Sequence, residues 1–128
     1  MNTALVRLLP ILCLCALARF CYAGDFQTVI MLPSSNPTLT ISVPGDHFVV
    51  IRNFTQEGGT TRGTVQANLL ISGLTANILT AAIIDPANVN PGQLEVINDV
   101  YVGGPATVTV TCPSTATSCA VTYRRRSE

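Results

Sequence analysis

The sequence predicts an all-β protein that folds as a single antiparallel β-sandwich of about seven to eight strands. Short runs rich in valine, isoleucine and threonine recur about every 8 to 14 residues along the chain. Proline, glycine and asparagine separate these runs, and no segment has the longer period of an amphipathic helix. A jelly-roll or an immunoglobulin-like sandwich fits this pattern, and a small barrel is the alternative.

The first half of the sequence contains three expected strands. Residues 27–32 form a short β-branched run before a proline-rich turn, and we expect this strand at a sheet edge, open to pairing with another strand. Residues 38–43 alternate apolar and polar side chains, which turns one face toward the core. Pro44 and Gly45 then form a turn. Residues 47–54 are a denser apolar run, whose length and composition favour a largely buried strand.

The second half is expected to contain the remaining strands. Residues 64–72 alternate in the same way. The side chains of this run that we expect to face the core are Val65, Ala67, Leu69 and Ile71. Residues 77–84 fit either a strand or a helical turn, because their alanines are compatible with both. Residues 85–92 are too rich in proline and asparagine for regular structure. The last expected strands are 93–102, 106–112 and 120–124.

The N-terminal residues have the layout of a secretory signal peptide. Residues 1–7 carry one positive charge, residues 8–18 form an apolar run, and small residues stand three and one before Gly24. A membrane anchor is the alternative, but it needs about 20 apolar residues, more than this run supplies. We therefore expect residues 1–23 to be removed and residues 24–128 to form one domain. That domain would be secreted, periplasmic or extracellular, with no transmembrane segment after cleavage.

Cleavage at this site leaves a single pair of cysteines, Cys112 and Cys119. An even pair in an exported chain most often forms a disulfide. The two cysteines stand at the facing ends of two alternating runs, so we expect the bond to close a hairpin and to contribute about 2 to 3 kcal/mol. A redox centre would more typically have the Cys-x-x-Cys spacing, which this pair lacks.

The composition argues against several classes of function. Residues 24–128 contain five arginines, seven acidic residues and no lysine, so we expect no nucleic-acid partner. His47, which follows Asp46 beside a turn, is the only histidine, and it leaves too few ligands for a zinc or copper centre. No G-x-S-x-G elbow supplies a nucleophile for a Ser-His-Asp triad. We therefore expect no cofactor, and an exposed polar role for His47.

Paired carboxylates are the remaining catalytic option. The acidic residues are scattered along the sequence, whereas a glycosidase needs two of them about 5 to 9 Å apart. A domain of this size also leaves little scaffold for a cleft of several hundred Å³. The expected function is therefore not enzymatic, and a small carboxylate-based glycan hydrolase is the alternative.

One loop offers a weak signal for calcium. Asp85, Asn88 and Asn90 carry side-chain oxygens of the kind that Ca²⁺ binds. Their spacing is not that of an EF-hand, and such residues are also common in turns. We keep these three residues as weak metal candidates.

A second loop region offers a weak signal for an anionic ligand. Arg52, Glu57 and Arg62 would form either a site for a ligand such as an acidic sugar or a surface ion-pair cluster of little energetic worth. The same region contains the one N-glycosylation sequon of the mature chain, at Asn53.

Two further stretches bear on binding. Residues 124–126 are three consecutive arginines, which form either a contact for a polyanion or a solvated tail. A stripe of outward-facing threonines, Thr107, Thr109 and Thr111, is typical of an exposed strand, with a glycan-binding or ice-binding face as the alternative.

The function expected from the sequence is an exported, non-catalytic β-sandwich module with a binding, adhesion or structural role. Its partner would be a protein, a glycan or a second copy of the chain that associates through an edge strand.

We predict that the exported protein begins at Gly24, because the cleavage pattern ends at Ala23. Intact mass spectrometry of the protein recovered from outside the cytoplasm checks this prediction. A product that keeps Met1 and stays in the cytoplasm would contradict it.

Overall fold

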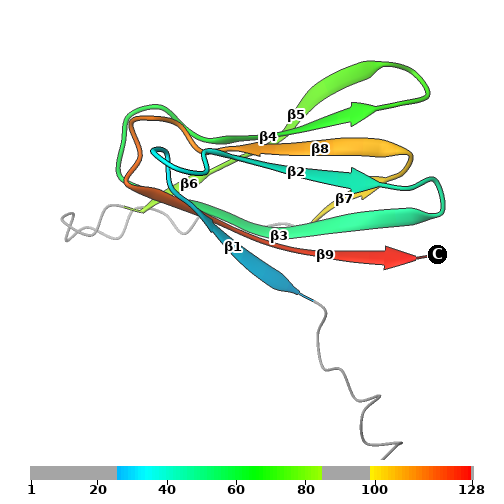
Figure 1. Ribbon diagram of the computed structural model, residues 1–128, viewed down its shortest axis with the longest axis horizontal. Coiled ribbons are helices and arrows are strands. Elements are labelled where there is room, and N and C mark those ends of the chain that lie inside the picture. Colours follow the sequence, from blue (N-terminus) through cyan, green and yellow to red (C-terminus); the bar gives the residue numbers. More distant parts are fainter. Residues whose placement is uncertain (1–25, 85–98, 128) are drawn as a thin grey trace, which may run out of the picture.

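The computed structural model describes residues 26–84 and 99–127, which form two packed β-sheets (Figure 1). The five-stranded sheet contains β1 (Gln27–Met31), β3 (His47–Glu57), β6 (Ala82–Ile84), β7 (Val100–Gly103) and β9 (Ser118–Ser127). The four-stranded sheet contains β2 (Thr38–Val43), β4 (Thr64–Leu69), β5 (Leu74–Thr80) and β8 (Ala106–Thr111). Within these ranges no helix is long and apolar enough to cross a bilayer.

The strands pair in a nested order. The β4–β5 hairpin is innermost, and β3 with β7, β2 with β8 and β1 with β9 form successive antiparallel pairs around it. Two further antiparallel pairs, β3 with β9 and β4 with β8, join these pairs into the two sheets, which are not closed into a barrel. This nesting is a jelly-roll arrangement. The predicted all-β sandwich is therefore confirmed, and β1 lies at a sheet edge as expected.

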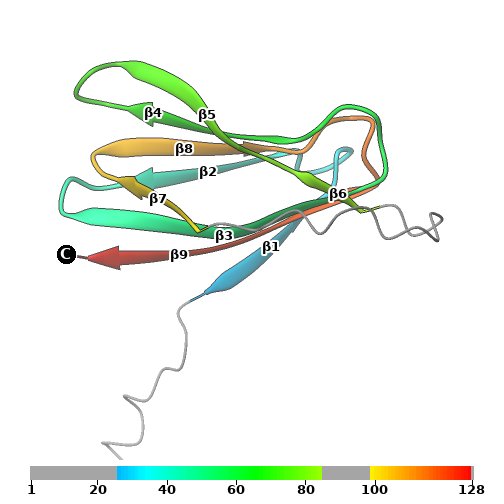
Figure 2. The same ribbon diagram turned by 180° about the vertical axis from the view of Figure 1, so that it is seen from behind.

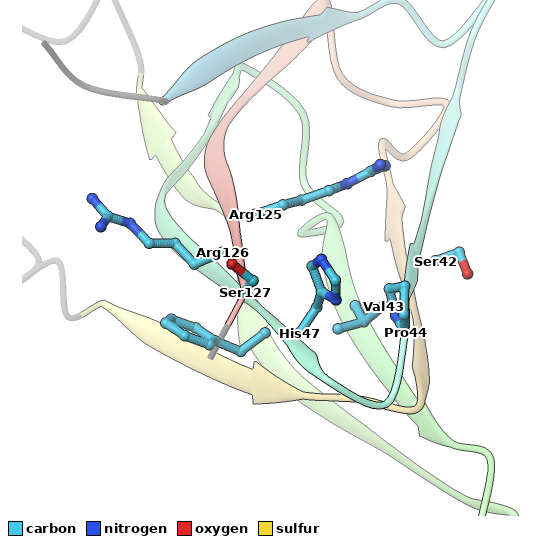
Figure 3. A pocket seen from close by; sticks show the side chains of 8 residues that line it. Ser42, Val43, Pro44, His47, Arg125, Arg126 and Ser127 are labelled. Atoms are coloured by element: carbon cyan, nitrogen blue, oxygen red, sulfur yellow. The ribbon is translucent and has the colours of Figure 1, made fainter. Parts of the chain in front are cut away.

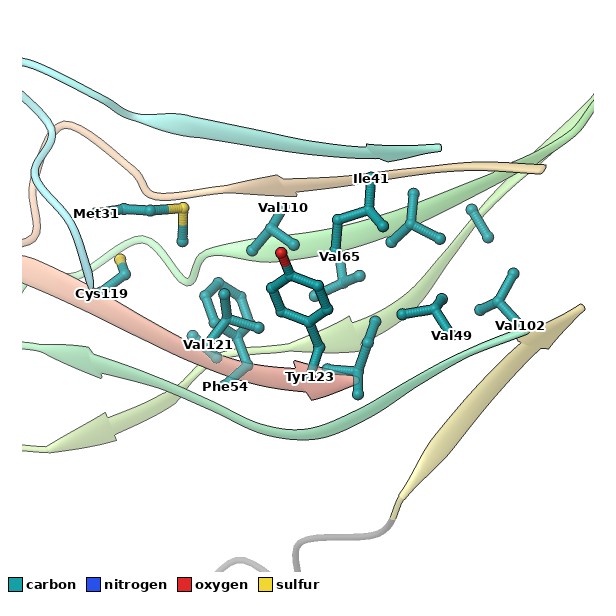
Figure 4. Close-up of a cluster of buried hydrophobic side chains, with 14 of the residues drawn as sticks. Met31, Ile41, Val49, Phe54, Val65, Val102, Val110, Cys119, Val121 and Tyr123 are labelled. Atoms are coloured by element: carbon teal, nitrogen blue, oxygen red, sulfur yellow. The ribbon is translucent and has the colours of Figure 1, made fainter. Parts of the chain in front are cut away.

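The core lies between the sheets and follows the alternation of the strands (Figure 4). Ile41 of β2, Val65 of β4 and Val108 of β8 point inward from one sheet, and Val49 and Val121 point inward from the other; all five are fully buried. Valine and isoleucine suit these positions because β-branched side chains pack well on a pleated surface. The sequence alternation therefore becomes the packed interface of the sandwich.

The β4–β5 hairpin departs from the predicted burial. Val65 and Ala67 are buried as expected, but Leu69 is 43% exposed and Ile71 is 86% exposed, so the prediction for these two residues is wrong. The strand ends at Leu69. From both sides the hairpin is seen to rise away from the five-stranded sheet toward its turn, which leaves the last side chains uncovered (Figures 1 and 2).

Residues 77–84 form strand rather than a helical turn, and they change sheet within that segment. β5 ends at Thr80 in the four-stranded sheet, and β6 begins at Ala82 beside β3 in the five-stranded sheet. Between them Ala81 is fully buried, and its N–H donates to the carbonyl of Gly63 at 2.9 Å. A small side chain is suited to this crossing point because the chain passes through the core between the two sheets.

The disulfide between Cys112 and Cys119 is present, and both cysteines are buried. The bond does not close a hairpin, because β8 belongs to the four-stranded sheet and β9 to the five-stranded sheet. The expectation of a hairpin is therefore wrong, although the inward faces of the two strands were placed correctly. The bond joins the two sheets at one end of the core.

At the same end Gln56 organises the connection from β3 to β4. Its side chain is only 1% exposed. The amide oxygen accepts the N–H of Gly63, and the amide nitrogen donates to the carbonyls of Gly58 and Thr61, each at 2.8 Å. These three bonds satisfy a buried amide that would otherwise be costly to desolvate. The connection is therefore fixed to the core.

We predict that changing both cysteines to serine lowers the free energy of unfolding by about 2 kcal/mol, near the low end of native disulfide losses. Urea unfolding of the oxidised protein and of the double variant checks this value. The wild-type protein in reductant is the matched control and should fall to the stability of the variant. Reaction of the native protein with a thiol reagent without reductant would contradict the prediction.

Candidate oxyanion-binding cleft

One end of the sandwich gathers four segments that are far apart in sequence. The β2–β3, β4–β5 and β7–β8 turns and the last residues of β9 lie together at the right of Figure 1. The strand pairing places these segments at the same end: Val43 and Leu69 both pair with Ala106, and His47 pairs with Ser127. We call this the cleft end, and it comprises residues 42–48, 69–74, 103–106 and 124–127.

A cleft of about 490 Å³ opens at the cleft end. Its apolar lining residues are Val43, Pro44 and Phe48, and its polar lining residues include His47 and Arg125. The volume lies within the range of about 300 to 1,000 Å³ that is typical of small-ligand sites. The expectation that so small a domain leaves little room for a cleft is therefore wrong, because this cleft forms at the end of the core and not inside it.

The position of Arg125 follows from the alternation of β9. Val121 and Tyr123 point into the core, and Arg125 is the next residue on the same face. Its backbone lies opposite Val49 of β3, near the last part of the core. The guanidinium therefore reaches into the opening, where Figure 3 shows Arg125 directed toward β2 while Arg126 points to the other side of β9.

His47 is held by its neighbour in sequence. Its Nδ1 lies 2.6 Å from Oδ1 of Asp46. This hydrogen bond holds the pKa of Asp46 below its ordinary value, so the carboxyl group is charged at neutral pH. A carboxylate only accepts hydrogen bonds, so Nδ1 carries a proton and Nε2 is left for another partner. The ring itself lies on the same side of β9 as Arg125 (Figure 3).

Arg125 and Arg126 have no carboxylate partner among residues 26–84 and 99–127. The two ion pairs in that part of the protein join His47 to Asp46 and Arg52 to Asp99. A guanidinium without a counterion beside an apolar wall presents N–H donors in a fork that matches an oxyanion. The cleft is therefore suited to a ligand that carries a carboxylate, sulfate or phosphate group.

The cleft also contains the residue types of a hydrolytic triad. Asp46 and His47 are joined, and Ser42 and Ser127 line the same opening. Within the described ranges, however, no hydrogen bond joins either serine hydroxyl to the His47 ring. A serine nucleophile depends on that bond to lose its proton.

The structure does not bring Arg52, Glu57 and Arg62 together as one cluster. Arg52 pairs with Asp99 at 3.2 and 3.3 Å, which raises the pKa of the guanidinium, and it stacks 4.1 Å from the ring centre of Phe26. Glu57 lies five residues farther along β3, about 16 Å away, and accepts a hydrogen bond from Ser118. Arg62 directs Nη1 toward the carbonyl of Ala81. A ligand role for these three residues stays a prediction.

The remaining site candidates stay predictions as well. Asn53 lies in β3 opposite Thr122 and is half-buried, and its Oδ1 is buried without a hydrogen-bond partner in the described structure. The calcium candidates Asp85, Asn88 and Asn90 lie outside the described residues. Within those residues, no group of three or more histidine, cysteine or acidic side chains is placed to hold a metal ion.

The described carboxylates are spread out. Asp46 stands before β3 and Glu57 ends it, eleven residues farther on, so their backbones are about 36 Å apart in an extended strand. Asp99 precedes Val100, which pairs with Ile51 near the middle of β3. These three residues are therefore not arranged as the close pair that a glycosidase uses.

The outer face of the four-stranded sheet is polar but carries no charge. The predicted threonine stripe of β8, Thr107, Thr109 and Thr111, forms its central column. Across the sheet these threonines pair with Thr38, Thr40 and Ser42 of β2 and with Thr64, Gln66 and Asn68 of β4. None of the four strands contains an acidic or basic residue. The charges of the described residues therefore lie in the five-stranded sheet and in the turns.

Sequence reasoning missed the cleft because it ended the last strand at Arg124 and considered the three arginines only as a polyanion contact or a solvated tail beyond that strand. The sequence did contain a signal for this position. The alternation that turns Val121 and Tyr123 toward the core places Arg125 on the same face of the strand. The fold and the cleft thus define a small jelly-roll module with a cationic opening at one end. Comparison with protein-family models, curated proteins and solved structures finds no match to the chain.

Proposed function

We propose that the protein is an exported, non-catalytic binding module that holds the oxyanion group of a ligand in the cleft. The observation that carries this proposal is Arg125, which enters a cleft of about 490 Å³ without a carboxylate partner among the described residues. Its guanidinium would donate two parallel hydrogen bonds to the oxyanion. Nε2 of His47, which has no proton in the neutral ring when Nδ1 carries one, would accept a hydrogen bond from a hydroxyl group of the ligand. Val43 and Pro44 would cover the carbon skeleton of the ligand.

Two features support export. The signal-peptide layout ends at Ala23. The Cys112–Cys119 disulfide is compatible with an oxidising compartment, where such bonds form and persist. The ligand would therefore be met outside the cytoplasm.

Hydrolysis is the competing function, and the Asp46–His47 pair beside Ser127 is the observation in its favour. The binding function is preferred because the described structure contains no hydroxyl hydrogen-bonded to the His47 ring. The pair also has a simpler role, which is to orient the ring toward the cleft and to keep a proton on Nδ1.

We predict that oxyanions shift the imidazole NMR signal of His47, which is easy to assign because the protein has a single histidine. Inorganic phosphate and glucuronate are the probes, and glucose is the uncharged control. Arg125→Gln removes the charged fork and should weaken binding about tenfold or more. The matched control Arg62→Gln changes an arginine at the opposite end of the sandwich and should leave binding unchanged.

An unmoved His47 signal with both anions, or equal affinity in Arg125→Gln and the wild-type protein, would overturn the proposed ligand site. Turnover of an ester or glycoside that Ser127→Ala abolishes would instead establish the hydrolase. The thermal midpoint of each variant shows that the fold is retained.

A further inference from the structure

The turn of the β4–β5 hairpin exposes large apolar side chains. Leu70 is 57% exposed, Ile71 86% and Leu74 68%. Leucine and isoleucine are usually buried, and a contiguous group of them on a surface marks a site of interaction. The turn is internally bonded, because the N–H of Gly73 donates to the carbonyl of Leu69 at 2.8 Å. The hairpin therefore presents a compact apolar tip.

The apolar tip and the cationic cleft face the same way. Leu69 and Val43 flank Ala106 on neighbouring strands, so the base of the tip and the wall of the cleft are about 10 Å apart. The N–H of Leu70 donates to the carbonyl of Pro105 at 3.1 Å, which holds the tip to the β7–β8 turn. Apolar and cationic groups thus belong to one surface of the molecule.

The charge of this surface is one-sided. Arg124, Arg125 and Arg126 lie there, and Asp46 is the only carboxylate among the described residues of the cleft end. Arg124 stacks 4.6 Å from the ring centre of Phe26, which leaves the other two guanidinium groups for a ligand. The segment from Gly63 to Ile84, which includes the tip, contains no charged residue.

We propose that the cleft end docks on a lipid bilayer that contains anionic phospholipids. Ile71, Leu70 and Leu74 enter the interfacial region, while Arg125 and Arg126 bind headgroup phosphates. This inference rests on the proposed function, because the oxyanion in the cleft is then the phosphate of a lipid headgroup. The hairpin turn is suited to a shallow insertion because the N–H of Gly73 and the carbonyl of Leu69 are already hydrogen-bonded to each other within the turn.

Charge complementarity favours a bilayer over a second copy of the chain as the occupant. In a symmetric contact each copy presents the same surface, so the arginines of both copies would be brought into one interface. Such like-charge contacts oppose association. An anionic bilayer instead supplies both an apolar layer for the tip and phosphates for the guanidinium groups.

Single tryptophans test the insertion directly, because the protein contains none. Ile71→Trp places a fluorescent reporter on the tip. Ile30→Trp is the matched control, since Ile30 is an isoleucine with 64% exposure on β1, opposite Ala120 and away from the cleft end. On vesicles of phosphatidylcholine and phosphatidylglycerol, the emission of Ile71→Trp should shift to the blue and that of Ile30→Trp should not. Vesicles of phosphatidylcholine alone should shift neither.

Charged variants separate this inference from the proposed function. Ile71→Asp should reduce co-sedimentation with the anionic vesicles about tenfold or more and leave the response of His47 to inorganic phosphate unchanged. Ile30→Asp should change neither measurement, and Arg125→Gln should weaken both. Circular dichroism of each variant checks the fold.

Three results would overturn the docking inference. If the wild-type protein does not sediment with anionic vesicles while His47 still responds to phosphate, the bilayer is wrong and the oxyanion cleft stands; if both measurements fail, both proposals fall. If analytical ultracentrifugation shows a dimer that Ile71→Asp dissociates, and vesicles are not bound, the tip is covered by a second copy instead.

Discussion

The antiparallel ladder between β3 and β9 is the contact on which the rest of the structure depends. It runs from His47 opposite Ser127 to Glu57 opposite Ser118, with one irregularity between Ile51 and Asn53. It is the central pairing of the five-stranded sheet, so β1 attaches to one side and β6 and β7 attach to the other. Because both strands are long, the ladder spans the whole sandwich and connects its two ends.

The two ends of this ladder have different chemistry. At one end Gln56 is buried with all three of its hydrogen bonds made, and Cys119 is bonded to Cys112 of the other sheet. At the other end the same two strands present His47 and Arg125 to an open cleft. The closed end stabilises the fold, which leaves the open end free to carry polar groups that the core does not need. The closed, disulfide-bonded end and the proposed binding cleft thus lie at opposite ends of one pair of strands.

Much of the fold was predictable from the sequence because strand alternation is a local property. The inward positions of Val65 and Ala67 and of the two cysteines follow from a period of two residues. The same period failed at Leu69 and Ile71, because alternation assigns a side chain to a face and does not show whether another sheet covers that face. The alternation also did not show that β8 and β9 belong to different sheets. Two successive strands have the same local pattern whether they pair in one sheet or lie in two facing sheets.

The candidate site was less predictable than the fold. Arg125 and His47 are 78 positions apart in the printed sequence, and only the long β3–β9 pairing brings them to one opening. The most direct test is a map of backbone amide NMR shifts during titration with glycerol phosphate, a soluble mimic of a lipid headgroup. We expect the shifts to concentrate in residues 43–47 and 124–127. Shifts that concentrate around Glu57 and Ser118 at the closed end, or no shifts at all, would contradict it.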